Sequence, residues 1–149
     1  MPYDALVERN IAVPRGKVFA AFYDFGGLTR LVPDAVSSCE CIGEGVGSQR
    51  SISLADGGTV VERMDVAHDE KVFAYSILEN DAIPVDNYCA VITLEDTADG
   101  GTNISYGSNW LPRDPEQEDE LQELFAGLYN ALIDGVVATA AAEAQETES

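Results

Sequence analysis

The sequence has few basic residues for its length. Eight lysines and arginines stand against 27 aspartates and glutamates in 149 residues, which gives a formal net charge of −19. Such a chain repels the phosphate backbone of nucleic acids and the surface of an anionic membrane, so we expect neither as a partner. The charge favours solubility, and it is compatible with a saline habitat, where salt screens the self-repulsion.

Histidine and cysteine are also scarce. His68 is the only histidine, and it lies in a predicted turn with no serine or cysteine obviously paired with it. Cys39 and Cys41 share one face of a predicted edge strand, and neither they nor Cys89 form a CxxC pair. We therefore expect reduced thiols, no metal, no cofactor and a cytoplasmic location.

Long apolar runs and nucleotide-binding motifs are missing. No stretch approaches the ~20 consecutive apolar residues of a membrane helix, and the N-terminus lacks the pattern of a signal peptide. The glycine-rich segment GEGVGS, residues 43–48, precedes an alternating strand pattern and not a helix. Since a phosphate cradle needs that helix, we interpret the segment as a turn in which glycine tolerates positive φ.

Hydrophobic periodicity predicts one α+β domain over residues 1–149. An apolar fraction of 46% is typical of a folded globule. Helical spacing after Pro14 and a short apolar stretch before Pro33 predict two short helices behind a first strand at 3–12. The period then changes to two, and turn residues separate six further strands at 36–43, 48–55, 59–67, 71–79, 87–95 and 102–111.

A long C-terminal helix is predicted over residues 116–143, ahead of an acidic tail, 144–149, that is expected to fray. Apolar residues recur at i, i+3, i+4 and i+7 and give this helix one apolar face. That face comprises Leu121, Leu124, Phe125, Leu128, Leu132 and Val136. We expect the helix to pack this face across the antiparallel sheet.

Arg50 and Glu62 lie on otherwise apolar faces of two adjacent predicted strands. A three-residue turn at 56–58 pairs Ile52 with Glu62 and puts Arg50 diagonal to Glu62. An ion pair on an apolar face must satisfy itself or contact water in a cavity. The alternative is that the face with Val61 is the inner one and that both charges are solvated.

The order of elements and several segments resemble a known superfamily. The segments that carry the resemblance are 13–34, 45–65, 71–78, 83–94 and 102–110. They resemble the START-like or birch-pollen-allergen-like (SRPBCC) superfamily, and within it the polyketide cyclase/dehydrase-like branch. The resemblance implies a helix-grip fold, in which a curved sheet of seven antiparallel strands wraps the long C-terminal helix. It also implies a cavity between sheet and helix for an apolar ligand.

The resemblance further implies which residues line that cavity. On this sequence they are Arg50, Glu62, Met64, Phe73, Tyr75, Tyr88, Tyr106 and Trp110, with Leu124, Phe125 and Leu128 on the inner face of the helix. The gates would be the loop 79–87 and the segment 25–31. Alternation alone also places the three tyrosines and the tryptophan on inward faces. Such side chains suit a mostly apolar, partly oxygenated ligand, although ordinary core packing is the alternative.

Three functions remain open from the sequence. The first is binding or carriage of a small hydrophobic, partly oxygenated molecule, lipid- or polyketide-like, by a monomer or homodimer. The second is a polyketide cyclase or dehydrase that uses Glu62 and Arg50 as catalytic groups and tyrosine hydroxyls to steer an enol or enolate. Burial would raise the pKa of Glu62 and Arg50 would lower it. The third is a module that presents its sheet to a partner protein, which a cavity filled by side chains would favour.

Overall fold

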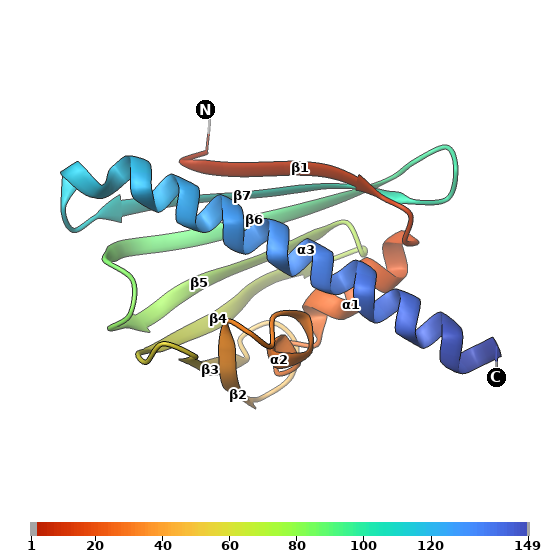
Figure 1. Cartoon of the computed structure of the whole chain (residues 1–149), viewed down its shortest axis with the longest axis horizontal. Coiled ribbons are helices and arrows are strands. Elements are labelled where there is room, and N and C mark those ends of the chain that lie inside the picture. The colour runs from red at the N-terminus through yellow and green to blue at the C-terminus, as the bar shows by residue number, and fades with distance from the viewer. Residues whose placement is uncertain (1–2, 149) are drawn as a thin grey trace.

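A seven-stranded antiparallel sheet with helices on one face forms the computed structural model (Figure 1). The structure describes residues 3–148, with side chains over residues 3–145. The strands are β1 (Ala5–Ile11), β2 (Val36–Ile42), β3 (Gln49–Leu54), β4 (Thr59–His68), β5 (Val72–Asn80), β6 (Val85–Asp96) and β7 (Thr102–Pro112). The helices are α1 (Arg15–Tyr23), α2 (Leu28–Leu31), the 3-10 helix η1 (Pro115–Gln117) and α3 (Glu118–Glu148). The predicted α+β helix-grip fold is confirmed.

One connection carries the chain from one edge of the sheet to the other. The strand order is β1-β7-β6-β5-β4-β3-β2, so β1 and β2 lie at opposite edges. The connection between them holds α1 and α2, which lie on the same face of the sheet as α3 (Figure 1). Because α2 contacts both α3 and β2, it closes one side of the space between helix and sheet.

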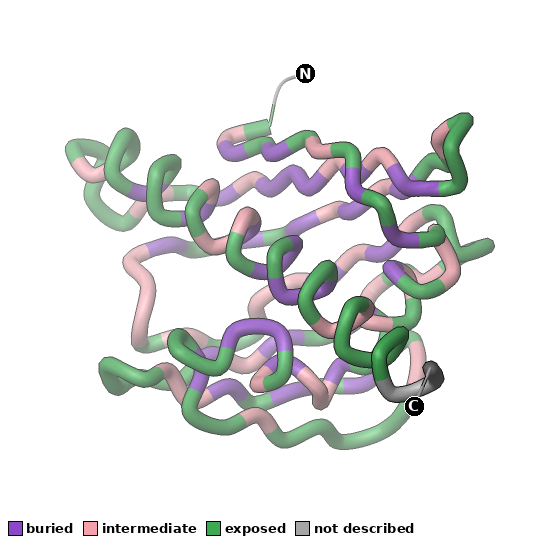
Figure 2. The backbone as a smooth tube through the Cα atoms, turned by 45° about the vertical axis from the view of Figure 1, so that its right-hand side comes forward, coloured by how far each residue is buried: buried purple, intermediate pink, exposed green. Residues whose placement is uncertain are grey.

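Alternating burial along the strands identifies the inner face of the sheet (Figure 2). In β4 the side chains of Val60, Glu62 and Met64 are buried, whereas Val61 and Arg63 between them are more exposed. Side chains two residues apart share one face of a strand. The buried set therefore lies beneath the helices, and the alternative in which Val61 faces inward is wrong.

The turn between β3 and β4 lies one residue earlier than predicted. Ile52 pairs with Val60, and the Leu54 N–H donates to the Gly58 carbonyl oxygen at 3.1 Å, so the three turn residues are 55–57 and not 56–58. Two successive glycines at the end of the turn have φ angles of +95° and +93°, which only glycine adopts at little cost. As a result Arg50 lies directly opposite Glu62 and not diagonal to it.

The connection between β5 and β6 is shorter than the predicted loop 79–87. Strand β5 extends to Asn80 and β6 begins earlier than expected, which leaves residues 81–84. The Asn80 Oδ1 accepts hydrogen bonds from the backbone N–H groups of Ala82 (2.9 Å) and Ile83 (2.8 Å). A side-chain amide can hold a turn in this way because it mimics a backbone group. The predicted gate is therefore a four-residue turn held by Asn80.

Helix α3 buries most of the predicted stripe, together with Tyr129 and Ile133, which were not predicted. The inward stripe comprises Leu121, Phe125, Tyr129, Leu132, Ile133 and Val136. Leu124 is 52% exposed, so its predicted place on the inner face is wrong. With 3.6 residues per turn, Leu124 lies about 100° around the helix from the fully buried Phe125. The centre of the stripe passes through Phe125 and Tyr129, which leaves Leu124 on the solvent side.

A glycine in α3 permits close contact with α2. A Cβ atom at Gly135 would lie 2.1 Å from the carbonyl oxygen of Leu31, closer than any real contact. The absence of a side chain therefore lets the two helices meet backbone to backbone. This contact fixes α2 against α3 at the side of the enclosed space.

Residues Pro115–Gln145 are long and apolar enough, by length and composition, to cross a membrane. The core helix of a protein that crosses no membrane can have the same length and composition, so these two properties are weak evidence for a transmembrane helix. Here the apolar stripe centred on Phe125 and Tyr129 faces the sheet, and the opposite side of the helix is exposed.

Substitutions at adjacent positions of α3 test this orientation. Phe125→Ala should lower the free energy of unfolding by about 3–5 kcal/mol, because it empties a buried aromatic site. Leu124→Ala should change it by less than about 0.5 kcal/mol, because its side chain already contacts water. Denaturant unfolding of both variants gives the two values. A larger loss for Leu124→Ala than for Phe125→Ala would show that the helix is rotated.

Candidate functional site

The Arg50–Glu62 ion pair is the polar centre of the inner face. Its two members come from facing positions of β3 and β4, and they are only 8% and 7% exposed. The Arg50 Nε donates to Glu62 Oε1 at 2.8 Å, and Nη2 lies 2.6 Å from the same oxygen. The side chains between which the pair sits are apolar, so each charge depends on the other for its solvation.

Arg50 also ties the sheet to the connection between α1 and α2. Its Nη1 donates to the carbonyl oxygen of Phe25 at 3.3 Å. The guanidinium carbon lies 3.9 Å from the centre of the Phe25 ring and 5.3 Å from that of Tyr75. A planar cation between aromatic faces keeps favourable electrostatic contacts where water is excluded. One side chain thus joins β3, β4, β5 and the segment after α1.

Burial and pairing act on the two charges in opposite directions. Burial raises the pKa of Glu62, and the attraction of the Arg50 guanidinium opposes that shift without cancelling it. Burial acts to lower the pKa of Arg50, but the adjacent Glu62 carboxylate, together with Tyr75 and Tyr106, raises that pKa above its ordinary value. Arg50 therefore stays charged, and Glu62 is the member of the pair that takes up a proton more readily than an exposed glutamate.

One oxygen of Glu62 is left for another partner. Both close contacts of Arg50 are with Oε1, and no described side chain or backbone group forms a hydrogen bond with Oε2. Oε2 also keeps some exposure, since the only fully enclosed side-chain polar atom without a partner among residues 3–145 is Ser76 Oγ. Glu62 lines an internal cavity, so its carboxylate presents a free acceptor there.

The internal cavity has a volume of about 70 Å³ and lies between the pair, α2 and α3. Its polar lining consists of Arg50, Glu62, Tyr75 and Tyr88, and the rest is almost entirely apolar. The volume corresponds to about two water molecules at the ~30 Å³ that each occupies in the liquid. Pockets for drug-sized ligands measure ~300–1,000 Å³. In the described conformation the walls of the cavity therefore enclose too little space for a drug-sized ligand.

Four buried tyrosines form a chain of hydroxyl groups beside the cavity. Tyr129 donates to Ser108 Oγ at 2.5 Å and also contacts Tyr88. Tyr75 contacts Tyr88 at 3.2 Å and Tyr106 at 2.5 Å. Each phenol has one proton to donate, and Tyr129 uses its proton on Ser108, so Tyr129 must accept from Tyr88. By the same argument Tyr88 accepts from Tyr75, and Tyr75 accepts from Tyr106. Tyr75 and Tyr88 can therefore only accept hydrogen bonds from a ligand.

Burial keeps these phenols neutral. It is the largest cause of the raised pKa of all four, and it shifts Tyr75, Tyr88 and Tyr106 well above their ordinary value of 10.0. The hydroxyl hydrogen bonds and the neighbouring phenols modify each shift. At neutral pH the chain is therefore an uncharged set of paired hydroxyls.

The structure separates the predicted lining residues into three groups. Arg50, Glu62, Tyr75, Tyr88, Phe125 and Leu128 line the cavity. Met64, Phe73, Tyr106 and Trp110 are buried in the packed core around it and do not line it. For example, the Trp110 and Phe125 rings pack with centroids 4.7 Å apart. Leu124 faces away from the cavity, as described above.

Sequence reasoning missed two members of the hydroxyl chain. Tyr129 follows Phe125 by one helical turn, and Ser108 alternates with Tyr106 and Trp110 on the inner face of β7. The i, i+4 spacing from Phe125 was the available signal for Tyr129. Within residues 3–145, no group of three or more His, Cys, Asp or Glu side chains is placed to hold a metal ion.

Comparisons with known proteins agree with this architecture. A family model described as "Polyketide cyclase / dehydrase and lipid transport" matches residues 5–141. The chain belongs to this family. No curated protein matches the chain by sequence.

Solved structures similar to this family member show the same fold. XoxI from Bacillus cereus is 22% identical with a TM-score of 0.78, and the match covers 94% of this chain and 96% of that one. Norcoclaurine synthase from Thalictrum flavum, in complex with dopamine and hydroxybenzaldehyde, is 19% identical with a TM-score of 0.72. That match covers 90% of this chain and 83% of the synthase. At these identities the likeness shows the fold alone.

A double-mutant cycle tests the buried pair. Arg50→Met or Glu62→Leu alone should lower the free energy of unfolding by about 3–5 kcal/mol, because each leaves an uncompensated buried charge. The double variant should recover most of that loss, since two apolar side chains replace the pair. Thermal and denaturant unfolding measure the cycle. The exposed pair of Arg63 and Asp65 is the control, and Arg63→Met should cost less than about 1 kcal/mol. Small, additive effects at Arg50 and Glu62 would show that water solvates the pair.

The tyrosine chain predicts steep loss of stability at alkaline pH. Because the folded protein raises the pKa of four phenols, it keeps protons that the unfolded chain releases above about pH 10. Their contribution to stability is full below that pH and is lost as the pH rises. With four groups the loss approaches about 5 kcal/mol per pH unit.

Tyrosinate absorbance and far-ultraviolet circular dichroism, followed together against pH, measure this loss. A Tyr3→Phe/Tyr23→Phe variant removes the two exposed phenols from the signal. Absorbance in this variant should then rise together with the loss of secondary structure. Ionisation of the four buried phenols in a protein that keeps its native dichroism would contradict the account.

Proposed function

We propose that the protein binds and carries a small, mostly apolar ligand with one hydroxyl-type group, which the Arg50–Glu62 pair holds. The observation that carries the proposal is the free Oε2 of Glu62 at the polar end of an otherwise apolar cavity. Glu62 is only 7% exposed, and its Oε2 has no partner among the described residues, so a ligand that donates a hydrogen bond to Oε2 gains affinity.

The hydrogen-bonding groups at that end specify the ligand's polar group. The acceptors are Glu62 Oε2 and the phenol oxygens of Tyr75 and Tyr88, whose protons are used within the hydroxyl chain. The donors are the Arg50 N–H groups that remain after its contacts with Glu62 and Phe25. A hydroxyl or enol group both donates and accepts, so it matches this set. The site's net charge of zero favours a neutral ligand.

Ligand entry requires the cavity to enlarge. The volume of about 70 Å³ is below that of an engineered cavity of ~150 Å³ that takes up benzene. Two short segments border the cavity: helix α2 with the residue after it contributes Leu28 and Val32 to the lining, and the turn 81–84 contributes Ile83. We infer that these two segments move apart to admit the ligand.

The comparisons support this class of ligand. The family description includes lipid transport, and norcoclaurine synthase has a structure in complex with dopamine and hydroxybenzaldehyde. The cavity is not filled by side chains, so the third function, a module for partner proteins, lacks the observation that would favour it.

A second candidate is a cyclase or dehydrase reaction at the same pair. The raised pKa of Glu62 and its free Oε2 favour a carboxylate that accepts a proton from an apolar ligand. The remaining N–H groups of Arg50 would then stabilise the enolate that forms. The tyrosine hydroxyls, which the sequence analysis expected to steer the enol or enolate, have their protons engaged in the hydroxyl chain. A Glu62→Gln variant that binds ligand and loses turnover would favour this candidate.

Two matched probes test the binding proposal: 4-ethylphenol, and ethylbenzene, which lacks only the hydroxyl group. We expect 4-ethylphenol to bind about tenfold more tightly, the ratio that one satisfied buried hydrogen bond provides. NMR shift titration measures both affinities. The Arg50→Met/Glu62→Leu variant should lose this preference, because it has neither donor nor acceptor at the polar end. Equal affinity for both probes in the unsubstituted protein would contradict the proposal.

A pair of tryptophan substitutions tests where the probe binds. Leu128→Trp should abolish binding of 4-ethylphenol, since Leu128 lines the cavity. Leu124→Trp, one turn earlier on the exposed side of α3, should leave it unchanged. Circular dichroism establishes that both variants are folded. Native mass spectrometry of protein purified from its own host would then identify the natural ligand.

A further inference from the structure

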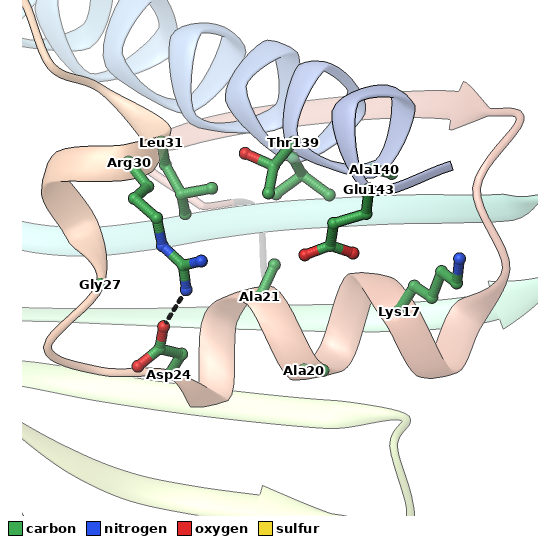
Figure 3. A pocket seen from close by; sticks show the side chains of 11 residues that line it. Lys17, Ala20, Ala21, Asp24, Gly27, Arg30, Leu31, Thr139, Ala140 and Glu143 are labelled. Atoms are coloured by element: carbon green, nitrogen blue, oxygen red, sulfur yellow. Dashed lines mark hydrogen bonds and ion pairs between the residues drawn. The ribbon is translucent and has the colours of Figure 1, made fainter. Parts of the chain in front are cut away.

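A second hollow lies outside the sheet-and-helix cavity, between α1, α2 and the C-terminal half of α3 (Figure 3). Its volume is about 210 Å³, three times that of the internal cavity. Small side chains make room for it, including Ala21 of α1 and Ala140 of α3, and Leu31 and Val136 add apolar surface. The hollow corresponds to about seven water molecules, which suits a ligand the size of a small amino acid.

Charged groups of both signs surround this apolar surface. Lys17 and Asp24 come from α1 and the residue after it, Arg30 from α2 and Glu143 from α3. The Glu143 carboxylate projects between α1 and α3, and the Arg30 guanidinium projects between α1 and α2 (Figure 3). The four charges sum to zero in a chain whose net charge is −19. The hollow is therefore locally neutral on a strongly acidic protein.

Two cationic groups at the hollow retain capacity for a ligand. Six of the eight basic side chains form ion pairs, whereas Lys17 has none within the described residues. Arg30 contacts Asp24 Oδ2 through Nη2 alone, at 2.5 Å. Its Nε and Nη1 have no acceptor among residues 3–145, and the Thr139 hydroxyl is likewise without a hydrogen bond there. A guanidinium with two free N–H directions and a nearby hydroxyl are suited to a carboxylate.

The charges select among the possible ligand classes. A simple carboxylate would meet Glu143 inside the hollow and the field of a −19 chain outside it. A simple ammonium ion would leave the free N–H groups of Arg30 unused, and acidic groups elsewhere on the surface would serve it equally well. A zwitterion uses both signs and is not repelled by the net charge.

We propose that this hollow binds a small aliphatic zwitterion of the α-amino acid type. Arg30 and Thr139 hold its carboxylate, Glu143 holds its ammonium group, and its short side chain lies on Ala21 and Leu31. Lys17 does not contact the ligand in this arrangement, and its positive charge keeps the net charge of the four lining groups at zero. The site is separate from the Arg50–Glu62 cavity and does not depend on the function proposed for it.

Three matched probes test the proposal by NMR shift titration of the whole chain. They are valine, 3-methylbutanoate, which lacks the ammonium group, and 2-methylpropylammonium, which lacks the carboxylate. We expect valine to bind at least tenfold more tightly than either, with shifts confined to α1, α2 and the C-terminal half of α3. Absence of localised shifts with valine would overturn the proposal. So would equal binding of either control probe, or shifts centred on Arg50 and Tyr75.

Variants then assign the two ends of the ligand. Arg30→Gln and Glu143→Gln should each weaken valine binding at least tenfold, whereas Arg113→Gln should not, although it also breaks an exposed ion pair. Ala140→Trp, which fills the hollow, should abolish binding while the protein keeps its native circular dichroism. Valine affinity unchanged by Ala140→Trp or by Arg30→Gln would contradict the assigned site.

Discussion

The buried ion pair between Arg50 and Glu62 is the constraint on which the rest of the inner face depends. Two charges that lose their water are stable only if each finds the other together with further polar contacts. Arg50 meets this requirement by reaching Glu62, the carbonyl oxygen of Phe25 and two aromatic faces. Those contacts fix the register of β3 against β4 and hold the connection after α1 over the sheet. The position of α2, and with it the cavity, follows from that connection.

The aromatic residues next to the pair serve packing and polarity together. Tyr75 belongs both to the stack around Arg50 and to the chain of hydroxyls that ends at Ser108. Each phenol donates its proton to the next hydroxyl oxygen, and the last acceptor is Ser108 Oγ. The four phenols are therefore buried without a charge and without an unpaired O–H group. The cavity therefore has an apolar wall and a polar end. At the polar end, Glu62 and the tyrosines offer hydrogen-bond acceptors, and Arg50 is the only donor among the lining side chains. A site of this kind selects ligands by their hydroxyl groups more than by their shape.

The sequence predicted the fold and the inner face well, because both follow from local alternation. The period of two in β4 places Glu62 beside Val60 and Met64, and the structure has all three buried. The register of the β3–β4 hairpin could not be read in the same way, since alternation does not decide which three residues form the turn. Leu124 was misplaced because several rotations of an apolar helix match one pattern of leucines.

The extent of the cavity was beyond sequence reasoning for a different reason. Phe73 and Trp110 do face inward as predicted, but only the packing of distant segments decides that they pack on other rings beside the cavity and do not line it. The claim that the Arg50–Glu62 pair is buried and charged remains the centre of the account. NMR of the Arg50 Nε–H group tests it most directly. The account predicts a resonance that persists at mildly alkaline pH, exchanges slowly with water and shifts in Glu62→Gln. Exchange as fast as that of Arg30, whose side chain is 65% exposed, would contradict it.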